Sequence, residues 1–362
     1  MMRKNETQSG VVGRNDGGGA GLRVEVASDV PDWSAFLADR SDATIYHDPR
    51  WGQVMQRAYG NRPIYLTARD AGGSVVGIAQ LVLQKSLLFG THLCSLPYFD
   101  ASGILAADES ACEVLLDEAR SLREEHRADH VELRQMEPVS DSLPTRTDKV
   151  TMWLDLPSDA DALWDGLKAK VRNQVRKPTK AGMEAIRGGG ELLDQFCAVY
   201  EQTMRDLGSP PHSRRFFREV LGAFGEDVSL FLVRDGEEAV ASGLLLLCNG
   251  TAYLPWAASD WNRRKDCPNM LLYWEMLKFA CQRQAETFDF GRSTREAGTY
   301  RFKRQWGAEE IPLHWQFILP EGQSLPELRP DSGKYRFLTA CWRKLPVPLA
   351  RLLGPRLIAK LS

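Results

Sequence analysis

The chain has 362 residues, of which 43% are hydrophobic and 26% charged, and its formal net charge is −2. Because single cores rarely grow beyond about 250–300 residues, this length favours two domains. The near-zero net charge excludes a global field that attracts nucleic acid, so an anionic partner would have to bind a local patch.

The seven cysteines are scattered, form no CxxC motif and are not grouped with the six histidines. This pattern is typical of reduced thiols, so we expect neither disulfides nor a metal site. The first 22 residues lack the apolar segment of a secretion signal, and there is no run of about 18 apolar residues that would span a membrane. We therefore expect a cytoplasmic protein.

The first half predicts an α/β series that follows a disordered, Gly-rich tail at residues 1–21. The alternation of apolar residues predicts strands, and Asp48-Pro49 is suited to begin a helix. The expected elements, in chain order, are a strand at 22–28, a helix from about 48, a β-hairpin of strands 63–69 and 74–83, a helix at about 108–127 and a strand at 130–135.

The second half repeats this order at an offset of about 165 residues, with a two-residue Asn249-Gly250 turn typical of tight hairpins. So long a period indicates a duplicated domain, because solenoid repeats are about 20–50 residues long. The Pro-, Ser- and Asp-rich stretch 136–148 reads as a linker. The expected parts are domains at 22–148 and 149–322 and a C-terminal segment at 323–362; in the second domain we expect strands at 230–234, 239–247, 251–258 and 287–291 and a helix from Pro268 to about 284.

A basic helix is the strongest local feature. Residues 163, 167, 171 and 175 form an apolar stripe at i, i+4 spacing. The segment 168–180 has six basic residues and no acidic one, which favours an anionic partner such as phosphate or RNA over a merely solvated face, although the latter stays open. The basic residues are Lys168, Lys170, Arg172, Arg176, Lys177 and Lys180.

A second candidate site is the loop that follows the strand ending at Gly291. Loops at the carboxyl ends of strands are where α/β sheets place ligands. Its cations could neutralise phosphates or stabilise an oxyanion, unless this is an ordinary basic loop. They are Arg292, Arg295, Lys303 and Arg304; we find no GxSxG, Walker loop or GxGxxG in the chain.

The C-terminal stretch 334–361 interleaves aromatic and aliphatic residues with Lys and Arg. Basic amphipathic segments of this kind lie on anionic membrane surfaces. The alternative is a closing helix that packs across the first domain.

Four motifs together resemble the FemAB-type transferases over about residues 40–320: SLPYFDASG (95–103), VRNQVRKPTKAGM (171–183), VYEQTMRDLG (199–208) and FDFGRSTREAGTYRFKRQWG (288–307). They are most similar to the subgroup associated with PEP-CTERM/exosortase and exopolysaccharide loci. The resemblance implies an α/β fold with mixed sheets, built as two tandem GNAT-like (N-acyltransferase-type) domains. It also implies transfer of aminoacyl groups from aminoacyl-tRNA to amines of peptidoglycan precursors, or of acyl groups from acyl-CoA.

Carried over by motif, Lys303 would stabilise the developing charge and Asp100 would face it. Arg205 would contact a precursor phosphate, and Arg57 is a looser match to a phosphate-binding lysine. Tyr98 and Arg292 lie inside the motifs and are further substrate-binding candidates. Trp256, Asn269 and Tyr300 are candidate walls of the acceptor groove, with a purely structural role as the alternative for each.

The expected reaction is direct attack by an amine or hydroxyl on an activated carbonyl, since no nucleophilic Ser or Cys suggests a covalent intermediate. The acyl-CoA pyrophosphate motif Q/RxxGxG/A and a tRNA-binding coiled-coil arm are both missing from the sequence, so the donor stays open. We expect no tightly bound cofactor, a phosphate-bearing glycan or nucleotide-sugar partner, and contact with tRNA or the inner face of the membrane as further options. Rival interpretations are an acyl-CoA-dependent N/O-acyltransferase of exopolysaccharide synthesis and a non-catalytic membrane-surface adaptor.

Overall fold

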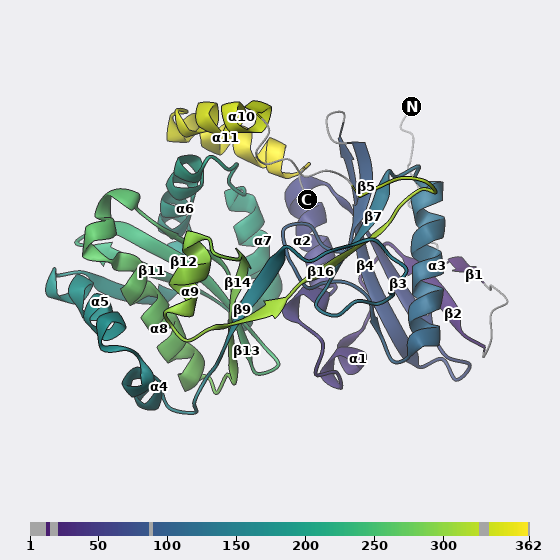
Figure 1. The fold of residues 1–362 in the computed structure, drawn as a ribbon, viewed down its shortest axis with the longest axis horizontal. Helices are drawn as coiled ribbons and strands as arrows, with labels where there is room; N and C mark the ends of the chain where they lie inside the picture. The colour runs from purple at the N-terminus through teal and green to yellow at the C-terminus, as the bar shows by residue number, and fades with distance from the viewer. Residues whose placement is uncertain (1–11, 15–20, 87–89, 326–332, 361–362) are drawn as a thin grey trace, which may run out of the picture. The chain divides into compact units, whose positions relative to one another are not determined.

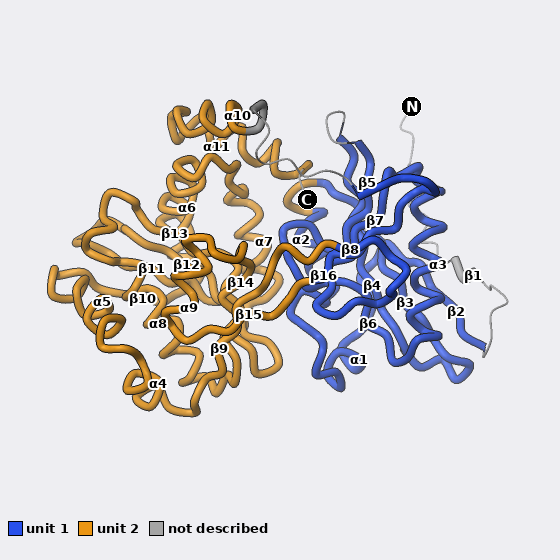
Figure 2. Tube along the Cα trace, viewed as in Figure 1, with its two compact units in different colours: residues 1–56, 60–145, 314–325 blue, residues 57–59, 146–313, 326–362 orange. Residues whose placement is uncertain are grey.

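The computed structural model describes residues 12–14, 21–86, 90–325 and 333–360 (Figure 1). The chain divides into two compact units (Figure 2): unit 1 comprises residues 1–56, 60–145 and 314–325, and unit 2 comprises residues 57–59, 146–313 and 326–362. Each unit has its own mixed sheet and its own apolar core. The expected mixed α/β class with two tandem units is therefore confirmed.

The sheet of unit 1 runs in the order β1-β2-β3-β4-β5-β7-β16-β8, with β6 paired to β4. Helix α3 (Glu109–Glu125) packs on β2, β3, β4 and β7. Its N-terminus is capped by Asp108, whose carboxylate accepts from the Ala111 N–H. The strands are β1 (Val12–Arg14), β2 (Arg23–Ala27), β3 (Arg62–Arg69), β4 (Val75–Ser86), β5 (Gly90–Cys94), β6 (Leu105–Ala106), β7 (His130–Gln135), β8 (Thr145–Arg146) and β16 (His314–Ile318); the other helices are α1 (Ser34–Ala38), the 3₁₀ turn η1 (Ile45–His47) and α2 (Arg50–Tyr59).

The sheet of unit 2 runs in the order β10-β11-β12-β13-β14-β9-β15. Its strands are β9 (Lys149–Asp155), β10 (Glu184–Gly188), β11 (Val228–Asp235), β12 (Glu238–Cys248), β13 (Thr251–Ser259), β14 (Thr287–Thr294) and β15 (Glu309–Pro312). Its helices are α4 (Ala160–Gly166), α5 (Ala169–Lys180), α6 (Leu193–Leu207), α7 (Arg214–Phe224), α8 (Pro268–Gln282), α9 (Gly298–Arg304), α10 (Gly333–Arg343) and α11 (Val347–Ile358), with 3₁₀ turns η2 (Gly190–Leu192), η3 (Gly225–Asp227) and η4 (Trp261–Asp266).

Helices α6 and α8 cover opposite faces of this second sheet. Neighbouring residues of a strand point to opposite faces, and two neighbours in β12 meet different helices. Ser242 donates from Oγ to the Phe196 carbonyl in α6, whereas Gly243 lies so close to Met276 of α8 that a side chain there would displace it. The sheet is thus buried on both faces, which explains the uninterrupted apolar run 244–247.

Both sheets share one arrangement. In each, a run of antiparallel strands, β1–β5 in unit 1 and β10–β13 in unit 2, ends in a parallel pair joined by a helix. The pairs are β5 and β7 joined by α3, and β13 and β14 joined by α8. A further strand then pairs antiparallel to the second member, β9 in unit 2 and β16 in unit 1. The repeat read from the sequence is therefore also a repeat of topology.

Three details differ from the sequence-based expectation. Residues 12–14, inside the expected disordered tail 1–21, pair with β2, while 1–11 and 15–20 lie outside the described residues. Residues 314–325 belong to unit 1 although the second domain was expected to extend to 322. The C-terminal helices α10 and α11 pack on α6 of unit 2, whereas one of the two alternatives had them pack across the first domain.

Candidate active site

The parallel strands β13 and β14 part after a short stretch of pairing. Their register runs from Thr251–Thr287 to Tyr253–Asp289 and then stops, although both strands continue for several residues. Each strand carries an irregularity at this point: the register with β12 shifts after Leu246–Tyr253, and the register with β9 shifts between Asp289 and Arg292. Bulges bend strands and increase their twist, so they account for the separation. Beyond this point the edge of β13 no longer pairs with β14, and it includes Pro255. Proline has no backbone N–H group, so its nitrogen needs no partner there.

Lys303 of α9 lies at this opening and is 6% exposed. Its Nζ donates to the carbonyl oxygens of Gly291 and Arg292, each at 2.8 Å. Gly291 has φ +74°, a left-handed conformation that favours glycine and turns these two carbonyls toward α9. The bulge of β14 therefore holds a buried ammonium group in place through the backbone.

Asp289 fixes the other side of the same bulge. Its Oδ1 accepts from Thr151 Oγ1 of β9 at 2.6 Å and from the Gly291 N–H at 2.7 Å. Ser293, two residues beyond Gly291, is 3% exposed, and its Oγ has no hydrogen-bond partner. The opening thus combines a buried cation, an anchored carboxylate and a buried hydroxyl on a rigid strand, which is the composition of a site that stabilises developing charge.

The corresponding opening in unit 1 is closed by the protein itself. Beyond the parallel pairing of β5 and β7, the Ser95 and Ser102 N–H groups donate to β7 carbonyls at 2.9 and 3.0 Å. Arg134 of β7 is 1% exposed, pairs with Glu132 at 2.8 Å and donates to the Phe99 carbonyl at 2.7 Å. Among the described residues, no such loop pairs with β14 beyond Tyr253–Asp289 in unit 2.

A basic loop leads from β13 into α8. The turn η4 contains the exposed cations Arg264 and Lys265, together with Arg263, which is paired with Asp235 and Asp266. Helix α8 begins with Pro268 at its first position. The first turn of any helix presents N–H groups without helical partners and a positive dipole end. Helix α5 packs on α8, and Lys177 of α5 donates to the Lys265 carbonyl. The basic helix and this loop therefore form one positive region beside the helix N-terminus.

Two members of the expected basic stripe on α5 have structural partners. The guanidinium of Arg172 donates to the carbonyls of Trp164, Asp165 and Leu167, which satisfies the end of α4. Arg176 lies 5.1 Å from the ring centroid of Trp164. The exposed cations of the segment are Lys168, which precedes the first residue of α5, with Lys170, Arg176, Lys177 and Lys180.

The other phosphate candidates are also engaged. Arg205, in the last turn of α6, donates to the Leu345 carbonyl at 3.0 Å and lies 2.6 Å from the Asp206 carboxylate. Arg57 in α2 lies 3.7 Å from Glu219 and is mostly exposed. Arg292 is exposed on β14.

The candidate groove residues occupy different environments. Trp256 is buried against the rings of Phe216, Phe217 and His212, so it is a core residue in this structure. Tyr300 donates to Glu310 at 2.8 Å, and this bond raises the pKa of its hydroxyl. Asn269 is half-buried at the second position of α8.

Tyr98 and Asp100 lie in the loop of unit 1 that covers its opening. Tyr98 has φ +76°, which is strained for a bulky residue and is found where surrounding structure enforces it. Asp100 is half-buried. Lys303 and Asp100 belong to different units.

Sequence reasoning missed Asp289, Thr151, Ser293 and the 263–265 loop. Asp289 could have been found as an acidic residue between two phenylalanines in an apolar strand. The loop could have been found from three consecutive cations just before a proline that begins a helix. Within the described residues no group of three or more His, Cys, Asp or Glu side chains could hold a metal ion.

Comparisons with known proteins agree with this geometry. The family model described as an acetyltransferase (GNAT) domain matches residues 167–304. A lipid II:glycine glycyltransferase of Staphylococcus haemolyticus (strain JCSC1435) is 32% identical over 90 residues, which are 23% of this chain and 22% of that protein. The chain therefore spans about a fifth of the length of this curated relative.

Several solved structures share the fold. The crystal structure of FemX superposes with a TM-score of 0.59 at 17% identity, covering 78% of this chain and 94% of FemX. The structure of L-PGS from Bacillus licheniformis gives 0.55 at 12% identity, covering 90% and 98%. The C-terminal domain of a putative lysylphosphatidylglycerol synthetase from Agrobacterium fabrum gives 0.53 at 10% identity, covering 74% and 87%.

The duplicated sheet with its parted strands defines a tandem GNAT-fold protein. One 90-residue segment is similar to a glycyltransferase, and the fold is similar to that of FemX.

Proposed function

We propose that this chain transfers an activated acyl or aminoacyl group to an amine, or a hydroxyl, of a phosphate-bearing cell-envelope precursor. The observation that carries the proposal is the parting of β13 and β14 with the buried ammonium group of Lys303 at the opening. Because the counterpart in unit 1 is closed by its own loop, we place the reaction in unit 2.

In the proposed step the nucleophile attacks the donor carbonyl, a bond forms to that carbon, and the bond to the leaving group breaks. The oxygen gains negative charge in the tetrahedral intermediate, and Lys303 stabilises that charge without having to move. The proton that the nucleophile loses is taken up by the departing thiolate or alkoxide. Asp289 is a positioning residue, because it fixes the bulge whose carbonyls hold Lys303.

For the donor we favour an acyl thioester of the coenzyme A type, used as a co-substrate and not held as a tightly bound cofactor. An extended arm carrying amide groups can add to the open edge of β13, as peptides add to sheet edges. Its phosphates would meet the N-terminus of α8 and the cations at 263–265. Aminoacyl-tRNA is the alternative, and the exposed lysines of α5 are consistent with either anion.

The donor is tested by the thermal shift of the purified chain with coenzyme A and a series of acyl-CoAs. A ligand at 100 times its Kd stabilises the fold by about 2.7 kcal/mol, or roughly 5–10 °C for a unit of this size. Arg264→Glu/Lys265→Glu should abolish the shift, while Lys85→Glu/Arg218→Glu, the same charge change elsewhere on the surface, should keep it. If no thioester shifts the melting temperature and charged tRNA supports transfer, the donor assignment is wrong.

For the acceptor we favour a peptidoglycan precursor, since the matched relative is named for glycyl transfer to lipid II. A nucleotide-sugar or lipid-linked intermediate of exopolysaccharide synthesis is the alternative, and both place the reaction at the inner face of the membrane. Lys303→Gln should lower kcat by about 10²–10³-fold, the usual effect of removing one oxyanion donor. Asp100→Asn, a change in unit 1, tests the role that the resemblance implies for this carboxylate and should lower kcat as well. Unchanged turnover in both variants would refute the proposed site and favour a non-catalytic adaptor.

A further inference from the structure

The last two helices expose an unusual amount of apolar side-chain surface. Within the described residues, six of the eight large hydrophobic side chains that are exposed lie on α10 and α11. Among them are Phe337, 67% exposed, and Leu352, 58% exposed. The six are Phe337, Leu338, Leu349, Leu352, Leu353 and Leu357.

On α11 these side chains form one face of the helix. Leu349, Leu352, Leu353 and Leu357 follow the i, i+3, i+4, i+8 spacing of a continuous stripe. The buried positions of the same helix, 350, 354 and 358, lie on another side at i, i+4, i+8 spacing. The exposed leucines therefore lie on a different face of α11 from the one that packs on its own unit.

Close packing fixes this orientation. Gly354 of α11 touches Pro211 so closely that no Cβ would fit, and Gly208 at the end of α6 meets Thr339 of α10 in the same way. The Arg343 guanidinium donates to the Leu207 carbonyl at 3.2 Å. Glycine at both contacts lets the helices lie against α6 at short range.

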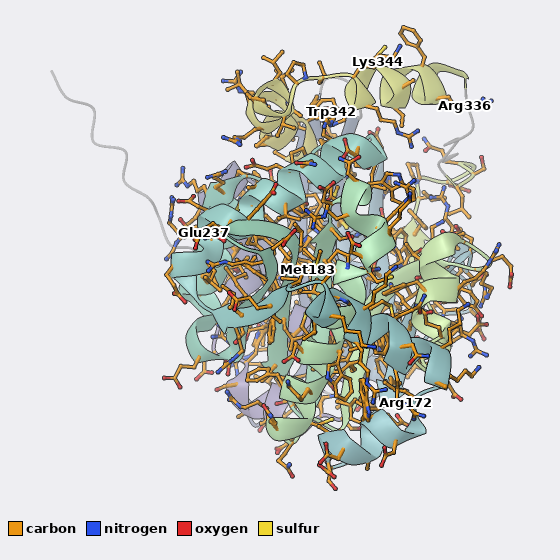
Figure 3. The ribbon with its side chains drawn as sticks, turned by 90° about the vertical axis from the view of Figure 1, so that its left-hand side faces the viewer. Arg172, Met183, Glu237, Arg336, Trp342 and Lys344 are labelled. Atoms are coloured by element: carbon orange, nitrogen blue, oxygen red, sulfur yellow. The ribbon has the colours of Figure 1, made fainter. Side chains whose placement is uncertain are left out.

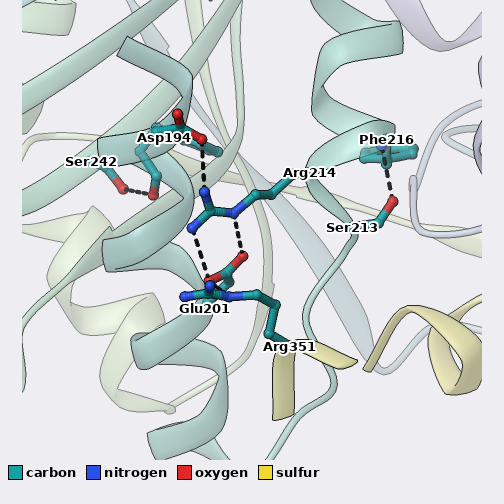
Figure 4. A network of polar contacts seen from close by, with 8 residues as sticks. Asp194, Glu201, Ser213, Arg214, Phe216, Ser242 and Arg351 are labelled. Atoms are coloured by element: carbon teal, nitrogen blue, oxygen red, sulfur yellow. Dashed lines mark hydrogen bonds and ion pairs between the residues drawn. The ribbon is translucent and has the colours of Figure 1, made fainter. Parts of the chain in front are cut away.

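A buried carboxylate adds a specific link (Figure 4). Glu201 of α6 is 1% exposed and accepts from Arg351 of α11 at 2.6 Å and from Arg214 at 3.0 Å. Arg214 also reaches Asp194. Because a buried carboxylate must be paired, this link holds α11 in one position on α6.

The exposed face is basic as well as apolar. Residues 333–360 contain seven Lys and Arg and no Asp or Glu, in a chain whose net charge is −2. Arg356 and Lys360 follow the leucine stripe of α11 at its next turns, and Arg336 of α10 and Lys344 just after it are exposed. Figure 3 shows the last two on the helix pair at the edge of the unit. No helix in the described part of the chain has the length and apolarity needed to cross a bilayer.

We propose that α10 and α11 form a lipid-binding face that docks the protein on an anionic bilayer. Leucine and phenylalanine side chains enter the boundary between headgroups and acyl chains, while Arg and Lys contact the anionic headgroups. The charge decides between occupants: a second copy would oppose the exposed cations Arg336, Lys344, Arg356 and Lys360 to their own copies, whereas an anionic lipid surface neutralises them. The inference is independent of the proposed reaction.

The test is sedimentation of the full chain with vesicles of phosphatidylcholine, with and without phosphatidylglycerol. We expect binding to the anionic vesicles, little binding to the neutral ones, and weakening by salt. Arg356→Glu/Lys360→Glu should weaken binding by roughly tenfold or more, and Leu352→Asp/Leu353→Asp should abolish it. These side chains are exposed, so the melting temperature should stay near that of the parent.

Lys85→Glu/Arg218→Glu has the same charge change at exposed positions outside the helix pair and should bind like the parent. Equal binding of the Leu352→Asp/Leu353→Asp variant would overturn the proposal. So would equal binding to neutral and anionic vesicles. A concentration-dependent dimer that is lost in this variant, without vesicle binding, would assign the face to a second copy and overturn it too.

Discussion

His212 gives unit 2 a calculable sensitivity to acid. Its ring is 4% exposed and stacks on Phe216 at 4.4 Å between centroids, and its Nδ1 lies 2.7 Å from the Tyr59 hydroxyl. Burial lowers the pKa of this imidazole from 6.5 to about 3. The folded protein therefore keeps His212 neutral at pH values where the unfolded chain binds a proton.

The difference between the folded and unfolded pKa values of His212 gives the sign and size of the effect of pH on stability. Since the unfolded state binds more protons below pH 6.5, stability is fully present above that pH and is lost as pH falls toward 3. At pH 5, one and a half units below the unfolded pKa, the loss is about 2 kcal/mol, and at pH 7 it is close to zero. His47 and His92 are also buried, with pKa values lowered to about 4, so they add to the total loss.

His212→Gln isolates the contribution of one ring, because glutamine does not titrate. Urea unfolding at pH 7 and pH 5 should show that the parent loses about 2 kcal/mol more than this variant between the two pH values. Phe288→Leu, in the apolar core of the same unit, is the control: it should lower stability at both pH values and keep the parent's pH difference. An identical pH difference in the parent and in His212→Gln would refute the reasoning.

Three further predictions concern named contacts. Arg172→Ala should destabilise unit 2 by about 1–2 kcal/mol in urea unfolding, because three carbonyls at the end of α4 lose their donor. The control Lys168→Ala, at an exposed position, should have no effect. Equal effects of the two substitutions would contradict the structural role of Arg172. Gly291→Ala should lower the free energy of unfolding by about 1–3 kcal/mol, because a φ of +74° strains any residue other than glycine. It should also lower turnover, because it displaces the carbonyls that hold the Lys303 ammonium group. Unchanged turnover would show that the bulge does not position Lys303. Arg351→Ala should lower the free energy of unfolding by about 1–3 kcal/mol, because buried Glu201 loses one of its partners. Limited proteolysis should then cut the C-terminal helices faster. Unchanged cleavage would mean that the Arg351–Glu201 link does not hold these helices.

Local signals predicted most elements of the fold. The expected strand 63–69 is observed as Arg62–Arg69, and the helix expected from Pro268 to about 284 is observed as Pro268–Gln282. Apolar period, turn residues and a proline at the first helical position are properties of short segments, so they can be read without the fold. The pairing of 314–318 with β7 could not be read, because it joins residues almost 180 positions apart and has no local signature.

The site was predictable only in part. Lys303 stood out through its motif, but the parting of β13 and β14 depends on bulges that only the pairing register reveals. Arg172 looked like a phosphate ligand because its charge was visible, whereas the carbonyls that it satisfies become available only when α4 ends six residues before it. Trp256 was expected in the acceptor groove, but the aromatic rings of α7 cover it. The period of apolar residues in a strand does not tell which helix packs on each face of the sheet.

The return of β16 to the first sheet has a consequence for synthesis. Strand β7 ends at residue 135, but its neighbour in the sheet, residues 314–318, leaves the ribosome only after nearly all of unit 2. Domains usually fold in order from the N-terminus as they emerge, yet the first sheet of this chain has an unpaired edge until the second unit has been made. The nascent protein therefore exposes that edge while residues 136–313 are made, and a fragment ending before residue 314 should aggregate even if it contains all of residues 1–145.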